Sequence, residues 1–195
     1  VYLFNSINHF LQYLINLKKT ITMKNYILIM LLAAFTFSCE TTVECEDNPA
    51  AGFLATADGK VPARDANPAN LDLWDKYIEA HNNRDLETIA SMNIDSTDLG
   101  QFRILGPTGQ IIRGTEEHSE FLKMWFDVEN PKWNTYFSYS MKVDGQQGEW
   151  VISGAQVKKT VDGQEVTSYD IADVYILDGK IGAFWVYTRA EVPQQ

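Results

Sequence analysis

One carboxylate stands in the middle of an apolar stripe near the end of the chain. Residues 168–177 and 180–189 alternate as two strands, and the Asp178-Gly179 dipeptide that joins them favours a tight hairpin turn. On one face of the first strand, Asp173 shares its side with bulky residues: Tyr169, Ile171, Tyr175 and Leu177. A carboxylate in such a stripe must be paired, protonated or facing a cavity, because burying a bare charge is costly. We therefore predict that this face lines a cavity, with Asp173 either as its functional acid or as a structural group bonded to a neighbouring Tyr or Trp.

Two further groups capable of moving a proton lie one helical turn apart. Residues 71–82 have the three- and four-residue apolar spacing of an amphipathic helix, and Asn70 is positioned to cap it. Tyr77 and His81 fall on the same face of that helix, so they can line one wall of a pocket. A structural reading stays open for each: Tyr77 as a core ring with a bonded hydroxyl, and His81 as a polar residue at the core boundary.

The remaining elements predict an α+β fold. Asp85 caps a second, shorter helix, and a third helix begins at Thr115 with an inward stripe of Phe121, Leu122, Trp125 and Phe126. His118, in the first turn of the third helix, is expected to be exposed. Short strands at 101–105 and 110–113 precede that helix, and long strands follow it at 133–143, 149–160, 164–177 and 180–189. Helices first and an antiparallel meander last predict a sheet that curls around the helices and leaves a conical pocket.

Three segments resemble the nuclear transport factor 2-like superfamily, in particular its SnoaL-like and ketosteroid-isomerase-like branch. They are Tyr77–Leu86 (YIEAHNNRDL), Gly109 and Gly114 before the third helix, and Asp173–Ile181 (DVYILDGKI). The resemblance covers about residues 70–190. It implies a cone in which three N-terminal helices pack on a curved antiparallel sheet around a deep pocket, and it implies that homodimers are common.

The resemblance also assigns roles to single residues. Tyr77 matches the tyrosine of the isomerase oxyanion hole, and Asp173 matches its protonated acid. The isomerase base, an aspartate just before a proline, has no counterpart, because the corresponding place reads Leu105-Gly106-Pro107. Two proton donors without a base cannot abstract a proton next to a carbonyl, which favours binding over steroid isomerisation.

These observations lead to one function and two alternatives. We expect a domain that binds a small apolar or aromatic molecule in a conical pocket, with Asp173, Tyr77 and His81 as the candidate catalytic or polar groups. The first alternative is an isomerase, cyclase or hydrolase-type enzyme that uses Asp173 or His81 for proton transfer. The second is a non-catalytic dimerisation or interaction module that uses the sheet face. The expected pocket lining consists of Trp74, Tyr77, His81, Trp125, Tyr169, Asp173, Tyr175 and Trp185.

Composition narrows the partners. The 195 residues carry a net charge of −10, and residues 1–38 hold three of the 16 basic residues and no acid, which leaves 13 basic against 26 acidic residues in the rest. Such a surface repels nucleic acid, so no nucleic-acid partner is expected. We expect no metal and no cofactor, because only His81 and His118 follow residue 38 and neither Cys39 nor Cys45 has metal-ligand spacing.

The start of the chain predicts export. Residues 23–38 have the positive start and twelve-residue apolar core of a signal peptide, and Thr36-Phe37-Ser38-Cys39 resembles a bacterial lipobox. We expect Cys39 to be lipidated, residues 39–69 to be a flexible tether, and residues 70–191 to be the folded domain. The protein would then be anchored by lipid in the bacterial cell envelope, facing the periplasm or the surface; the alternative is a soluble secreted protein. Residues 1–22 are expected to be an upstream extension, with the true start at Met23.

Overall fold

The computed structural model describes residues 11–13, 15–16 and 48–190, which belong to two separate units, 1–45 and 46–195. In the first unit the described residues are helical. The predicted signal segment 23–38 and Cys39 lie outside the described residues, so lipidation stays a prediction. Among the residues that are described, no helix is both long and apolar enough to cross a membrane.

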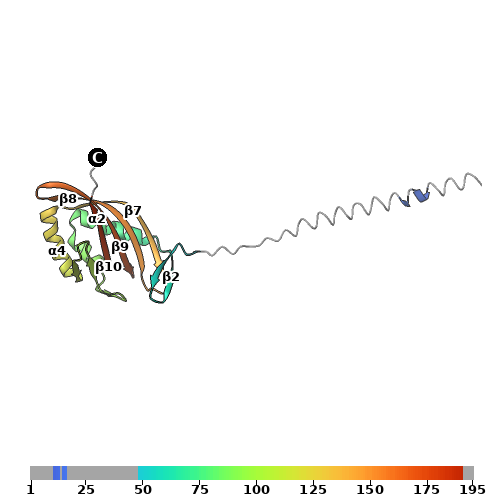
Figure 1. The fold of residues 1–195 in the computed structure, drawn as a ribbon, viewed down its shortest axis with the longest axis horizontal. Helices are drawn as coiled ribbons and strands as arrows, with labels where there is room; N and C mark the ends of the chain where they lie inside the picture. Colours follow the sequence, from blue (N-terminus) through green and yellow to red (C-terminus); the bar gives the residue numbers. More distant parts are fainter. Residues whose placement is uncertain (1–10, 14, 17–47, 191–195) are drawn as a thin grey trace, which may run out of the picture. The chain divides into compact units, whose positions relative to one another are not determined.

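The second unit is an α+β domain built on a large, curved and mostly antiparallel sheet (Figure 1). Its strand order is β1-β2-β7-β8-β9-β10-β5-β6. The long strands are β7 (Lys132–Val143), β8 (Glu149–Val161), β9 (Gln164–Leu177) and β10 (Lys180–Ala190). They pair in chain order, each antiparallel to the next, as the predicted meander requires.

The turns of the meander follow from its Asp-Gly pairs. Asp162 and Gly163 have φ of 50° and 78°, and Asp178 and Gly179 have φ of 51° and 71°. Both residues of each pair are therefore in the left-handed region, which aspartate and glycine tolerate better than other residues do. These turns fix the registers of β8 with β9 and of β9 with β10, and so decide which side chains share a face.

An N-terminal hairpin extends the sheet and corrects the predicted tether. β1 (Gly52–Thr56) pairs antiparallel with β2 (Gly59–Asp65), and β2 pairs with β7 through residues 63–65. Residues 52–65 are therefore part of the sheet, and the ordered domain begins well before residue 70. The turn at Asp58-Gly59 has the same residue pair as the later hairpins, but Ala and Pro62 in the strands hide the alternation.

The helices lie between the hairpin and the meander in the chain. They are α2 (Ala69–Asn83), α3 (Leu86–Met92) and α4 (Gly114–Glu129). Asp85 caps α3 as predicted, since its carboxylate accepts a hydrogen bond from the Thr88 N–H at 3.0 Å. Asn70 does not cap α2: it is buried within the helix, and its amide donates to Ser140 Oγ at 3.2 Å and to Glu149 Oε2 at 2.6 Å. It joins α2 to the sheet instead of starting the helix.

Short strands complete the sheet beside β10. β5 (Arg103–Leu105) runs parallel to β10 and pairs with β6 (Ile111–Arg113), while β3 (Ser96–Thr97) and β4 (Gly100–Gln101) form a separate pair. The core lies between the inner face of the sheet and the helices, and Figure 1 shows β8 curving over toward α4. Because the sheet curls, its inner face and the helices enclose space as well as a core.

Candidate functional site

A cavity of about 900 Å³ lies between the inner face of the sheet and the helices α2 and α4. Most of its wall is apolar and aromatic, including Trp74, Phe121, Trp125, Trp133 and Phe184. The size and lining are those of a pocket for a small organic molecule. The polar groups in the wall gather at two places, one deeply buried and one half-exposed.

Tyr77, His81 and His118 form the buried polar group, which we name the histidine floor. Tyr77 and His81 come from successive turns of α2, and their rings are 4.5 Å apart between centroids. His118 comes from α4, and its ring centroid lies 5.7 Å from that of His81. All three side chains line the cavity and are shielded from bulk solvent. The floor is thus built where the two helices approach each other.

The tautomer of His81 is set by its own helix. Its Nδ1 lies 2.7 Å from the main-chain oxygen of Tyr77, which can only accept a hydrogen bond. Burial lowers the pKa of His81 to about 4, with the nearby Arg84 charge acting in the same direction and the Tyr77 carbonyl opposing it. The ring is therefore neutral at pH 7, carries its proton on Nδ1, and leaves Nε2 as an acceptor.

His118 is buried, contrary to the expectation from its place early in its helix. Only 1% of its surface is exposed, and its Nδ1 has no hydrogen-bond partner among the described residues. Burial and, to a smaller extent, the neighbouring His81 together lower the pKa of His118 to about 3. The correction has a simple cause: α4 begins at Gly114, so position 118 continues the inward stripe that contains Leu122.

The hydroxyl group of Tyr77 is held by a buried asparagine. This hydroxyl donates to Asn93 Oδ1 at 2.9 Å, and Asn93 is itself buried. Burial raises the pKa of Tyr77 well above its ordinary value, and the bond to Asn93 only partly offsets this. The phenol is therefore a neutral, fully buried group that ties α2 to the end of α3.

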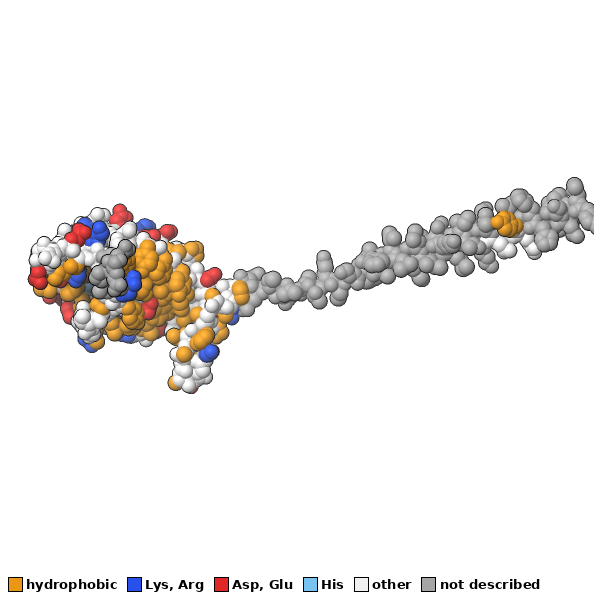
Figure 2. All heavy atoms as spheres, turned by 45° about the horizontal axis from the view of Figure 1, so that its top comes forward, with side chains coloured by type: hydrophobic (Ala, Val, Ile, Leu, Met, Phe, Trp, Pro, Cys, Tyr) orange, Lys and Arg blue, Asp and Glu red, His pale blue; other side chains and the backbone are white. Residues whose placement is uncertain are grey.

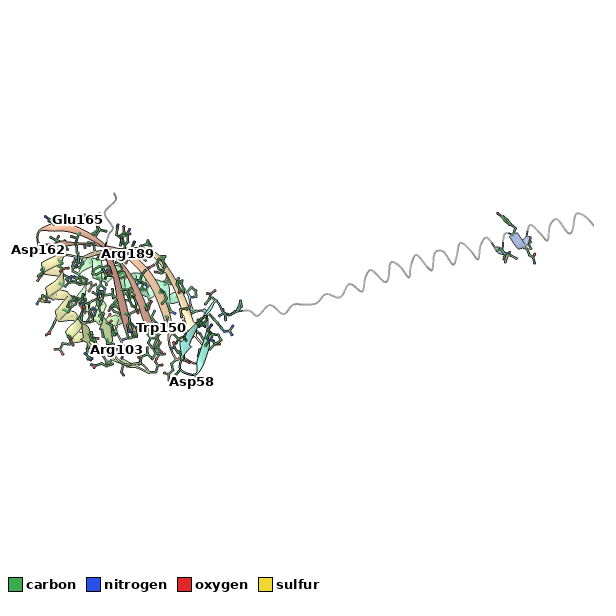
Figure 3. The ribbon with its side chains drawn as sticks, viewed as in Figure 1. Asp58, Arg103, Trp150, Asp162, Glu165 and Arg189 are labelled. Atoms are coloured by element: carbon green, nitrogen blue, oxygen red, sulfur yellow. The ribbon has the colours of Figure 1, made fainter. Side chains whose placement is uncertain are left out.

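The half-exposed polar group lies where α4 meets the β8–β9 hairpin, whose turn is marked by Asp162 and Glu165 in Figure 3. Lys159 Nζ and Trp125 Nε1 both donate to Glu129 Oε2 at 2.7 Å. Burial alone would raise the pKa of Glu129, but these two donors and the lysine charge together lower it. The opposite charges of Glu129 and Lys159 therefore cancel at this end of the cavity.

Asp170 is the carboxyl group that β9 contributes to the cavity. It accepts a hydrogen bond from Thr188 Oγ1 at 2.6 Å, across the β9–β10 pairing. Burial raises the pKa of Asp170, partly offset by the Thr188 bond and the Lys159 charge. Asp170, three residues before Asp173, is therefore the cavity-lining acid with a raised pKa that was expected at Asp173.

Asp173 lies on the opposite, outer face of the sheet, which corrects its predicted place. It pairs across the sheet with Ile152 on β8 and Trp185 on β10, and none of the three lines the cavity. Burial raises the pKa of Asp173, and a hydrogen bond with Tyr187 partly offsets the rise. Since side chains alternate along a strand, the cavity receives Asp170 and Ala172, and the core receives Val174 and Ile176.

The same alternation carries other predicted pocket residues outward. Tyr169, Tyr175 and Trp185 do not line the cavity. Tyr175 donates to Asp98 Oδ1 at 2.5 Å and accepts from the Gly148 N–H at 2.8 Å, while its ring packs on Trp150. Of the predicted lining, the cavity contains Trp74, Tyr77, His81 and Trp125.

The histidine floor offers hydrogen bonding and proton transfer by neutral imidazoles, and Asp170 adds a carboxyl group to the cavity wall. Gly106 and Pro107, which the sequence resemblance aligns with the region of the isomerase base, line the cavity, and neither carries an ionisable side chain. Among the residues that the structure describes, no three His, Cys, Asp or Glu side chains are grouped to hold a metal ion. A free histidine titrates near neutral pH, but burial keeps both His81 and His118 of the floor uncharged at pH 7.

Solved structures share this fold. A protein described as a SnoaL-like polyketide cyclase from Jannaschia sp. CCS1 is 16% identical with a TM-score of 0.50, over 64% of this chain and 90% of its own. Bal32a, from a soil-derived mobile gene cassette, is 12% identical with a TM-score of 0.51, over 61% and 88%. TerC, co-crystallised with polyporic acid, is 17% identical with a TM-score of 0.50, over 62% and 91%.

These likenesses show that the fold is shared with these solved structures. No protein-family model and no curated protein matches the sequence. At such low identity, function has to be inferred from the site rather than from the fold.

Proposed function

We propose that this protein binds a small, uncharged apolar or aromatic molecule in the cavity of a SnoaL-like cone, with α2, α3 and α4 packed on the curved sheet. The cavity of about 900 Å³ with its aromatic wall carries the proposal. Trp74, Trp125 and Trp133 give flat apolar surfaces for a ring system. The histidine floor supplies the few polar contacts that fix orientation in such pockets.

Electrostatics favours an uncharged ligand. His81 and His118 are neutral at pH 7, and the raised pKa of Asp170 shows that burial disfavours its charged form. Glu129 is neutralised by Lys159 at 2.7 Å. A ligand charge placed against the floor would have to be desolvated without a counter-charge, which costs several kcal/mol.

An enzymatic alternative rests on His81 rather than on Asp173. Because Asp173 lies on the outer face, it cannot exchange a proton with a molecule in the cavity. His81 lines the cavity with an acceptor nitrogen, so in an isomerase, cyclase or hydrolase-type reaction it would be the base. Binding is the better-supported function because it rests on the size and the aromatic lining of the cavity.

The test is titration of the full chain with Nile red, an uncharged apolar dye whose emission rises in apolar surroundings. We expect saturable binding at one site per chain. The variant Ala155→Phe should weaken it at least tenfold, because Ala155 is a buried cavity-lining residue of β8 and the added ring occupies the cavity.

Ile152→Phe is the matched control, because it lies on the same strand and pairs with Tyr139 and Asp173 on the outer face. It should retain wild-type affinity. Equal loss in both variants, or no saturable binding to a folded wild-type chain, would refute a cavity site.

A second candidate function, homodimerisation, is favoured by the outer sheet face. Tyr139 and Tyr187 on it are 50% and 54% exposed, and Phe137 is also exposed. Figure 2 shows hydrophobic side chains gathered in a broad patch beside the β1–β2 hairpin. Contiguous apolar surface of this kind marks an interface. Sedimentation of wild type and Tyr139→Lys should show a dimer and a monomer respectively; a monomeric wild type would exclude it.

We also propose that the domain is held in the bacterial cell envelope by lipid on Cys39. The support is the sequence of residues 23–39, with its apolar core and small residue before the cysteine. Mass spectrometry of the mature N-terminus should find a diacylated or triacylated Cys39, and Cys39→Ala should abolish the modification. An unmodified cysteine in the wild-type chain would support the soluble secreted alternative.

A further inference from the structure

The histidine floor contains acceptor and donor positions that a purely apolar ligand would leave unused. His118 is almost fully buried, lines the cavity, and has an Nδ1 without a partner among the described residues. Leaving a buried polar atom unpaired typically costs about 1–3 kcal/mol. Because the His118 side chain lines the cavity, a polar group of the ligand is the candidate partner for this atom.

The hydrogen bonding of His81 restricts the kind of ligand group that can bind here. Its Nδ1–H donates to the Tyr77 carbonyl oxygen, with 2.7 Å between the two atoms. In an imidazole, Nε2 lies farther from the backbone than Nδ1, so the acceptor of His81 is the nitrogen that reaches outward from α2. A ligand atom placed against it must donate a hydrogen bond.

We propose, on the basis of the binding function above, that the ligand is an uncharged hydroxylated ring compound, a phenol or an alicyclic alcohol, whose hydroxyl lies between His81 and His118. The hydroxyl donates to His81 Nε2 and accepts from His118 Nδ1–H. One oxygen with two hydrogen bonds of about 2.8 Å fits between rings whose centroids are 5.7 Å apart.

The arrangement discriminates against ligands of similar shape. An ether or a ketone has no hydrogen to donate, so its oxygen would face the lone pair of His81. A carboxylate is also an acceptor only, and it brings a charge to a floor whose two imidazoles are neutral. The hydroxyl is the group that is both donor and acceptor without charge.

The experiment compares three probes on the full chain at pH 7.5 by calorimetry: 1-naphthol, 1-methoxynaphthalene and 1-naphthoate. We expect 1-naphthol to bind about five- to tenfold more tightly than the methyl ether, the change that one or two neutral hydrogen bonds bring. The carboxylate should bind more weakly than the ether.

Two variants assign the preference to the floor. His118→Phe and His81→Phe keep ring volume and remove the nitrogen atoms, so each should reduce 1-naphthol affinity about fivefold and leave the ether within a factor of about two of its wild-type affinity. If a variant does not fold, the other variant and the wild-type probe series still decide the matter.

The outcomes separate this inference from the function on which it rests. If none of the probes, nor Nile red, binds a folded wild-type chain, the binding function itself fails. If the naphthol and the ether bind equally, the hydroxyl inference is wrong and the binding function stands. If the naphthol is preferred equally in wild type and in both variants, the hydroxyl is recognised elsewhere, which also overturns the inference.

Discussion

Nδ1 of His81 lies 2.7 Å from the main-chain oxygen of Tyr77, one turn earlier in α2. This contact within one helix fixes the proton on Nδ1 and leaves Nε2 as the acceptor nitrogen of a ring that lines the cavity. Two-bond ¹H–¹⁵N spectra should therefore show an unprotonated Nε2 in His81 at pH 7. The spectrum should stay unchanged down to about pH 5, because the pKa of His81 is about 4. A ring that gains its second proton near pH 6.5 would contradict the burial of this residue.

The stability of the domain should fall as the pH is lowered from 6.5 to 4. Burial lowers the pKa of His81 to about 4 and that of His118 to about 3. Between pH 6.5 and 4 these two histidines are therefore protonated in the unfolded chain and largely unprotonated in the folded domain. Each histidine then contributes a slope of about 1.4 kcal/mol per pH unit to the free energy of unfolding. Urea titrations at several pH values measure that slope.

His118→Phe should reduce the slope by about 1.4 kcal/mol per pH unit, and Tyr139→Phe on the outer face should leave it unchanged. Asp170 and Asp173 act in the opposite direction, because their raised pKa values make the folded domain bind their protons first as the pH falls. A wild-type free energy of unfolding that is flat or rises between pH 6.5 and 4 would show that the carboxyl groups outweigh the histidines.

Asp173→Asn should leave cavity binding intact, because Asp173 lies on the outer face beside Ile152 and Trp185. We expect its Kd for Nile red to stay within a factor of two of wild type. Asp170→Asn, three residues earlier, changes a cavity-lining group and should shift the Kd by more than that. The reverse ranking of the two variants would indicate that the ligand site lies on the outer face.

Gly148→Ala should destabilise the domain. A Cβ atom at position 148 would lie 2.5 Å from the main-chain oxygen of Ile176 and 2.5 Å from Tyr175 Cζ, and the Tyr175 ring is held by its bonds to Gly148 and Asp98. We expect a loss of about 1–3 kcal/mol in the free energy of unfolding, the range for overpacking. Gly52→Ala is the control, since nothing lies within 4 Å of its added Cβ. Equal stability of both variants would mean that the β7–β8 loop moves aside freely.

Local sequence predicted the elements well where the local signals were strong. The Asp-Gly pairs at 162–163 and 178–179 and the strands between them agree with the structure to within a residue or so. This is because turn geometry and strand alternation depend on neighbouring residues only. The helix stripe of Leu122 and Phe126 was readable for the same reason, and continued one turn back it would have included His118.

The choice of face on β9 was decided by tertiary structure alone. Its two sets of side chains, Asp170-Ala172-Val174-Ile176 and Tyr169-Ile171-Asp173-Tyr175, are both largely apolar, and each contains one acid. Alternation says that the sets lie on opposite faces but not which face meets the helices. The curled sheet encloses the smaller set with the helices and leaves the larger aromatic set outside. The sequence by itself thus determined the strands, the turns and the presence of a lone acid on each face, whereas only the packing of α2 and α4 against the sheet decided that the cavity is built around His81, His118 and Asp170.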